Sequence, residues 1–191
     1  MAETLLETYL QGLFPFSNFG HGTFNAIKSM GYRDEILARY SYAILNQATI
    51  DALKSYQPFL EVGAGIGYWA YEFKKNGIDY IATDPEPTCK DFFPTGTKCW
   101  TEIIKLTAVE AVRTYPNRTL LICWPGYGET WAYEVLKAFK GNIVVYVGEG
   151  QDGCCAEDKF FKLMNRDWDS EELSIPQWVG LHDKILILKK K

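Results

Sequence analysis

From residue 59 onward, short apolar runs alternate with amphipathic stretches of helical period. The apolar runs predict strands at residues 59–62, 79–83, 102–106, 119–124, 142–147, 170–175 and 184–189. The amphipathic stretches predict helices between them, at residues 68–76, from 107 onward, and at 131–139 and 157–165. Strands that alternate with helices indicate right-handed βαβ units in a mostly parallel, twisted sheet with helices on both faces. No helix separates the last two strands, so we expect a hairpin and an antiparallel last strand.

The first 56 residues show helical periodicity instead, at 3–13, 23–30, 33–40 and 47–56. Asn46 is a suitable N-cap for the last of these helices. Thr107 and Glu110 have the spacing of a capping box at the start of another helix. We therefore predict an α/β protein with an N-terminal helical cap at 1–56 and a core at 57–191, packed as one compact domain.

Composition narrows the function classes. The chain has 191 residues and a formal net charge of −4, which argues against an electrostatic nucleic-acid binder. It opens acidic and has no run of about 20 apolar residues, so we expect no secretory leader and no membrane span. Its five cysteines lack CxxC spacing and only two histidines occur, so we expect reduced thiols, a cytoplasmic location and no metal site. The oligomeric state is left open.

A glycine-rich turn follows the first predicted strand. The segment runs Glu61-Val-Gly-Ala-Gly-Ile-Gly67, with the acid inside the strand. Such a turn lets a ligand approach the backbone and the start of the next helix. A dinucleotide fingerprint needs a third small residue where this chain has Tyr68. Asp84 follows at the end of the second strand, where a carboxylate can accept both hydroxyls of a ribose.

Residues 61–67 together with Asp84 resemble the class I S-adenosylmethionine-dependent methyltransferases. The resemblance covers most of the chain from residue 59, including the terminal hairpin, and implies a Rossmann-like methyltransferase fold with S-adenosylmethionine as cofactor. It implies that the glycines face the methionyl and ribose portion, that Asp84 binds the ribose hydroxyls and that Glu61 supports the loop. The predicted cofactor-binding residues are Glu61, Gly63, Ala64, Gly65, Gly67, Tyr68, Trp69, Asp84, Pro85 and Tyr40.

More narrowly, five segments are similar to a group of uncharacterised methyltransferase-like proteins. These segments are 40–44, 67–70, 123–127, 148–150 and 175–178. In many methyltransferases helices that precede the core cover the cofactor as a lid. Residues 1–56 either form such a lid, with Tyr40 at the methionyl end, or simply pack against the core.

The substrate side should lie beyond the carboxyl ends of the strands. Residues 124–127 there read Trp-Pro-Gly-Tyr, similar to the loop (Asp/Asn/Ser)-Pro-Pro-(Tyr/Phe) of methyltransferases that modify exocyclic base amines. Trp124 replaces the polar residue, which puts a base amine in doubt as acceptor. Either these aromatic residues line a pocket for a planar or hydrophobic acceptor, or they pack under the sheet edge. The predicted substrate-binding residues are Trp124, Pro125, Tyr127 and Trp178.

Two residues are candidates for a general base. Glu149 ends the fifth strand beside the expected cleft, and His182 lies in the turn before the last strand. Each has a simpler interpretation: Glu149 as a cap of the following loop, and His182 as a solvated turn residue.

The sequence thus predicts a methyltransferase that moves the sulfonium methyl in line to an unidentified, small or planar acceptor. Aligning the acceptor and excluding water would be the main task of the site. Two alternatives are open: a non-catalytic module that binds S-adenosylmethionine, and a lyase or alkyl transferase that uses it. The sequence does not decide whether the acceptor is a small molecule or a macromolecule.

Overall fold

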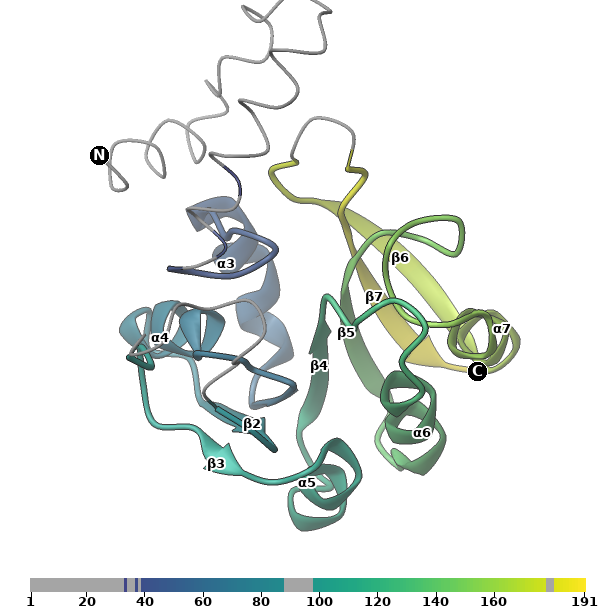
Figure 1. Cartoon of the computed structure of the whole chain (residues 1–191), viewed down its shortest axis with the longest axis horizontal. Coiled ribbons are helices and arrows are strands. Elements are labelled where there is room, and N and C mark those ends of the chain that lie inside the picture. The colour runs from purple at the N-terminus through teal and green to yellow at the C-terminus, as the bar shows by residue number, and fades with distance from the viewer. Residues whose placement is uncertain (1–32, 34–36, 38, 88–97, 178–180) are drawn as a thin grey trace, which may run out of the picture.

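A computed structural model describes residues 33, 37, 39–87, 98–177 and 181–191. Within this part of the chain, seven strands form one sheet in the order β3-β2-β1-β4-β5-β7-β6 (Figure 1). Their bounds are β1 (Phe59–Val62), β2 (Tyr80–Asp84), β3 (Ile104–Lys105), β4 (Thr119–Cys123), β5 (Ile143–Gly148), β6 (Trp168–Ser174) and β7 (Lys184–Lys190). Strands β1 to β5 pair in parallel and β7 pairs antiparallel with both β5 and β6. The predicted parallel sheet, hairpin and antiparallel last strand are confirmed.

Helices cover both faces of this sheet. Their bounds are α3 (Gln47–Leu53), the 3-10 turn η2 (Lys54–Tyr56), α4 (Tyr68–Lys75), α5 (Ala108–Thr114), α6 (Trp131–Ala138) and α7 (Asp158–Asp167). In Figure 1, α3 and α4 lie on one side of the strands and α5, α6 and α7 on the other. The strands supply alternate residues to the two layers: Leu121 and Val145 pack with α3 and α4, whereas Leu120 and Val144 pack with α5 to α7. The α/β class is therefore confirmed.

Local sequence signals set the helix starts. The Asn46 side chain accepts a hydrogen bond from the Thr49 backbone N–H at 2.8 Å, as predicted for an N-cap. Thr107 and Glu110 form the predicted capping box. The helix predicted at 47–56 is α-helical only to Leu53 and continues as η2, before the extended residue Gln57.

Two predicted strands differ in length. The third was expected at 102–106, but only Ile104 and Lys105 pair, because this strand lies at the edge of the sheet and contacts β2 alone. The sixth begins at Trp168, two residues earlier than predicted, since the whole of 168–174 pairs with β7. Neither difference moves the carboxyl ends of the central strands.

The helices predicted at 3–13 and 23–30, most of 33–40, and most of the loop at 85–96 lie outside the described residues. The division into a cap at 1–56 and a core at 57–191 therefore stays a prediction. Of the helices that are described, none has the length and apolar character needed to cross a bilayer.

Candidate functional site

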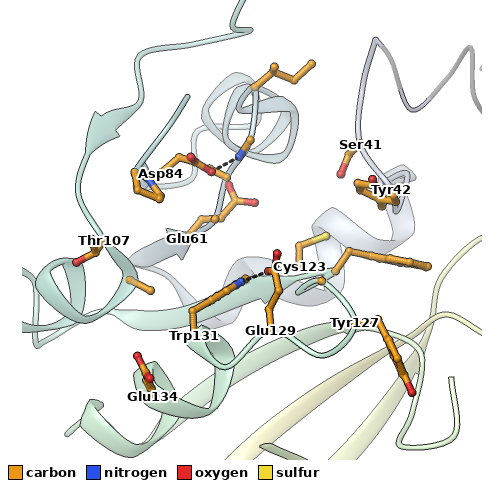
Figure 2. A pocket seen from close by; sticks show the side chains of 18 of the residues that line it. Ser41, Tyr42, Glu61, Asp84, Thr107, Cys123, Tyr127, Glu129, Trp131 and Glu134 are labelled. Carbon is orange, nitrogen blue, oxygen red and sulfur yellow. Dashed lines mark hydrogen bonds between the residues drawn. The ribbon is translucent and has the colours of Figure 1, made fainter. Parts of the chain in front are cut away.

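A cavity of about 780 Å³ opens at the carboxyl ends of β1, β2 and β4 (Figure 2). This volume is in the range of small-molecule sites. The cavity lies where a ligand is expected in an open parallel sheet. Its lining comes from the segment before α3, from β1 and the glycine turn after it, from the end of β2, from the start of α5, from the segment between β4 and α6, and from Cys154 in the loop after β5.

The glycine turn connects β1 to α4. Gly63 has a φ of 69° and Gly67, the N-cap of α4, a φ of 79°, both in the left-handed region. The Ala64 N–H donates to the Thr83 carbonyl at 3.0 Å, which fixes the turn against β2. A Cβ on Gly63 would lie 3.1 Å from the Trp131 ring. Gly63 is thus needed both for its backbone conformation and for the close approach of that ring.

Asp84 joins the end of β2 to this turn. Its Oδ2 accepts the Gly65 N–H at 2.9 Å and its Oδ1 accepts the Glu86 N–H at 2.7 Å. Burial raises the pKa of this carboxyl, and the two backbone hydrogen bonds oppose the rise. Asp84 also lines the cavity, so the same carboxyl that orders the turn is presented to a ligand.

Glu61 is the most perturbed carboxyl of the cavity. It lies inside β1 with 2% of its surface exposed, and its Oε2 makes no hydrogen bond with the described residues. Burial raises the pKa of Glu61 to about 8, the nearby Tyr80 hydroxyl partly offsets this, and the Asp84 carboxyl adds to it. A buried carboxyl of this kind gains a proton unless a positive group is placed beside it.

The opposite side of the cavity comes from α6 and the turn before it. The Trp131 Nε1–H donates to Glu129 Oε2 at 2.6 Å, and Glu129, Trp131 and Glu134 all line the cavity. Figure 2 shows the Glu129 side chain pointing into the cavity, toward the side that carries Glu61. None of these three residues is among the site residues predicted from the sequence. One feature of the sequence could have pointed to them: acidic and aromatic residues follow directly after β4, and the carboxyl end of β4 borders the glycine turn.

Trp124 and Tyr42 form a stacked pair at the cavity, with ring centroids 5.1 Å apart and an interplanar angle of 16°. Trp124 has a φ of 48°, rare for a bulky residue, and its Nε1–H donates to Asp183 Oδ1 at 2.8 Å. The Arg33 guanidinium lies 5.4 Å from the Trp124 ring centroid. The Tyr127 side chain also lines the cavity and is 78% exposed.

The two predicted bases do not line the cavity. Glu149 is buried, and its oxygens accept the backbone N–H of Cys154 at 2.8 Å and of His182 at 2.9 Å. Burial raises the pKa of Glu149, but these hydrogen bonds outweigh it and hold the pKa below its usual range. The His182 side chain is 85% exposed, with Nδ1 3.7 Å from Glu149. Glu149 therefore ties the loop after β5 to the start of β7, which matches its simpler interpretation.

Some of the other predicted site residues line the cavity and the rest do not. Those that line the cavity are Tyr40, Glu61, Gly63, Ala64, Gly65, Asp84, Pro85, Trp124 and Tyr127. Tyr68 and Trp69 are buried in the layer between the sheet and α4, where the Trp69 Nε1–H donates to the Ala43 carbonyl. Gly67 and Pro125 supply no surface to the cavity, although Gly67 starts α4 and Pro125 precedes Gly126. Trp178 lies outside the described residues.

The sequence matches no family model and no curated protein. Solved structures do match in shape. Magnesium protoporphyrin IX methyltransferase (ChlM) from Synechocystis PCC 6803, with bound S-adenosylmethionine, aligns with a TM-score of 0.51 at 9% identity, over 100% of this chain and 95% of that chain. A methyltransferase from Archaeoglobus fulgidus that depends on S-adenosylmethionine aligns at 0.49 and 16% identity, over 88% and 100%. The first likeness shows that the chain has the predicted Rossmann-like methyltransferase fold.

Proposed function

We propose that the protein is an S-adenosylmethionine-dependent methyltransferase that acts on a small or planar acceptor. One observation carries the proposal: Asp84 orders the glycine turn through Gly65 and presents its carboxyl to the same cavity. A carboxylate at the end of the second strand is placed to accept ribose hydroxyls. The turn beside it leaves room for a ligand to approach the backbone.

The charges of the cavity fit this cofactor. S-adenosylmethionine carries a sulfonium and an ammonium group, and Glu61 is a buried carboxyl with an unpartnered oxygen facing the site. A positive group near Glu61 would stabilise the ionised carboxylate and offset the free-energy cost of burying it in that form. When bound, the cofactor supplies an electrophilic methyl group. The chain's task is to place an acceptor in line with that methyl and to exclude water, for which the aromatic rings of Tyr42 and Trp124 are suitably placed.

A titration of the protein with S-adenosylmethionine by calorimetry tests the proposal. We expect saturable binding to the wild-type chain and a loss of affinity of roughly 10- to 100-fold in Asp84→Ala, because a hydrogen bond to a charged group contributes about 1.5–3 kcal/mol. Asp169→Ala is a matched control, since Asp169 is exposed on β6 at the far edge of the sheet.

Absence of binding to the wild-type chain, or equal affinity in Asp84→Ala, would overturn the proposal. Methyl release from labelled cofactor, assayed with fractions of a cell extract, separates the remaining alternatives. Binding without any turnover would favour a non-catalytic module, and a product that lacks the added methyl mass would favour lyase or alkyl-transfer chemistry.

A further inference from the structure

Within the described part of the chain, the cavity is lined by four carboxyl side chains and by no lysine, arginine or histidine. The four carboxyls are Glu61, Asp84, Glu129 and Glu134. Glu61 and Asp84 lie on the strands that border the glycine turn, and the proposed function assigns both to the cofactor. Glu129 and Glu134 face them from the other side and have no role so far. Cofactor binding therefore does not account for this second pair of carboxyls.

Glu129 is held in a defined position. Its Oε2 accepts the Trp131 indole N–H at 2.6 Å, and its backbone N–H donates to the Gly126 carbonyl at 3.2 Å across a turn in which Gly128 has a φ of 73°. This turn is fixed in turn to the loop after β5, because Gly128 N–H donates to the Ala156 carbonyl at 3.0 Å. The backbone of this turn is therefore tied to the loop after β5, and the exposed Glu129 carboxyl is positioned by its hydrogen bond to Trp131.

Gly126 makes room for that carboxyl. A Cβ at position 126 would lie 2.6 Å from Cδ of Glu129, and 2.8 Å from its Oε2. Gly126 does not have a positive φ, so its backbone conformation does not require glycine. The requirement is the space that the Glu129 carboxyl occupies. This gives a physical reason for glycine in the Trp-Pro-Gly-Tyr loop at 124–127.

The remaining oxygen of Glu129 is available to a ligand. Among the described residues, Oε2 has Trp131 as donor, whereas no hydrogen bond is made to Oε1. Figure 2 shows the side chain directed into the cavity and toward Glu61. A carboxylate oxygen in this place accepts a hydrogen bond and cannot donate one while ionised.

We propose that Glu129 binds the methyl acceptor and that the acceptor is an amine carried on a planar or apolar body. This inference rests on the proposed function. An N–H of the acceptor donates to Oε1 of Glu129, which orients the nitrogen lone pair. The acidic lining favours a neutral or cationic acceptor over a carboxylate or phosphate, because like charges in a cavity repel. The exposed ring of Tyr127 suits an apolar body and a positive charge.

The transfer step balances with these groups. An acceptor that arrives as an ammonium first loses one proton to water through the Glu129 carboxylate. The lone pair of the neutral amine then forms the new N–C bond as the S–C bond breaks, and the electrons of that bond stay on sulfur as a neutral thioether. The product nitrogen is then an ammonium that still carries the N–H bound to Glu129. That proton passes to the Glu129 carboxylate and from there to water, so the methylated amine leaves neutral and the carboxylate is restored.

Arg33 does not reverse this charge preference. Its guanidinium lies over the rings of Tyr42 and Trp124, at 5.7 Å and 5.4 Å from their centroids, and it does not line the cavity. The buried Asp183 lies close enough for Arg33 to lower the pKa of that carboxyl, against the larger effect of burial. Arg33 thus lies near a carboxyl, Asp183, as well as beside the aromatic pair.

Two matched probes test the inference: 2-naphthylmethylamine and 2-naphthoic acid, titrated into protein saturated with S-adenosylhomocysteine. We expect the amine to bind at least about 10-fold more tightly than the acid. Glu129→Gln should weaken amine binding about 10-fold or more while the affinity for S-adenosylhomocysteine stays the same, since the amide can still accept from Trp131 but loses the charge. Gly126→Ala should weaken amine binding to a similar extent while Glu129 itself is kept. The reason is that the Cβ added at position 126 would displace the Glu129 carboxyl. Glu171→Gln, exposed on β6, is the control.

The outcomes separate the two proposals. If S-adenosylhomocysteine does not bind, the proposed function fails and the inference fails with it. If S-adenosylhomocysteine binds but the amine binds no better than the acid, or not at all, the acceptor class is wrong. If both variants bind the amine as tightly as the wild-type chain does, Glu129 does not hold the acceptor. If both variants lose amine binding and keep the affinity for S-adenosylhomocysteine, the role of Glu129 is supported.

Discussion

Glu61 makes the stability of the free protein depend on pH. Its pKa rises from 4.5 to about 8 on folding, and the largest cause is burial of the carboxyl. Because the folded-state pKa lies above the unfolded one, the protonated form favours the native state. This contribution is fully present below pH 4.5, decreases as pH rises, and is lost above pH 8. Replacing Glu61 with Gln removes the titrating group while keeping its size.

The magnitude follows from the two pKa values. Each pH unit between them changes the free energy of unfolding by about 1.4 kcal/mol, so the whole window from 4.5 to about 8 corresponds to about 5 kcal/mol. At pH 7 the carboxyl is still mostly protonated in the folded wild-type chain but ionised in the unfolded one, and this lowers the free energy of unfolding by about 3 kcal/mol relative to low pH. The side chain is only 2% exposed, which limits screening by solvent. This cost is large beside a typical domain stability of about 5–15 kcal/mol.

Urea unfolding of both proteins at pH 5, 6, 7, 8 and 9 measures the effect. We expect the stability of Glu61→Gln relative to the wild-type chain to increase by about 1.2 kcal/mol per pH unit on average between pH 5 and 8, and then to level off. The average lies below the limiting slope because each end of this range overlaps one of the two titrations. Stabilities should be compared at equal m-values, since a change in m would indicate a different denatured or native state. A stability difference that is constant across this pH range would refute the placement of Glu61 as a buried, unpartnered carboxyl.

Two further predictions concern the same cavity. Binding of S-adenosylmethionine near pH 7 should release a fraction of a proton from Glu61, seen as a dependence of the binding enthalpy on the ionisation enthalpy of the buffer. Glu61→Gln should show no such dependence, and its persistence there would contradict the assignment. Gly63→Ala should lower the free energy of unfolding by about 1–2 kcal/mol, because position 63 has a left-handed φ and the added Cβ would lie 3.1 Å from the Trp131 ring. It should also weaken cofactor binding, as thermal unfolding and calorimetry would show; wild-type values for both would contradict the account of the turn.

The centre of the sheet was predictable from sequence because the central strands β1, β4 and β5 are buried on both faces. Residues 119–123 and 143–147 form near-continuous apolar runs that need no knowledge of the tertiary structure to be recognised. Caps such as Asn46 and Thr107 were also predictable, because each cap bonds to a residue only three positions away in the sequence. The edge strand β3 was not, because two pairing residues leave almost no pattern.

The site was predictable on the side of the glycine turn and not on the opposite side. Asp84 and Glu61 lie a characteristic number of residues from the glycines along the sequence, so the motif alone identifies them. Glu129 and Trp131 reach the cavity through a turn held by Gly126 and Gly128, and the close approach of the carboxyl to Gly126 exists only in three dimensions. Glu149 does not line the cavity, because its oxygens accept the backbone N–H of Cys154 and of His182, and no sequence pattern predicts these two bonds.

A crystal structure of the protein with S-adenosylmethionine tests the central claim most directly. The account predicts density for the cofactor in the cavity, with the ribose hydroxyls on Asp84, a positive group beside Glu61 and the methyl group directed toward the space in front of Glu129. Density at another place on the molecule, or a cofactor whose ribose does not contact Asp84, would contradict it.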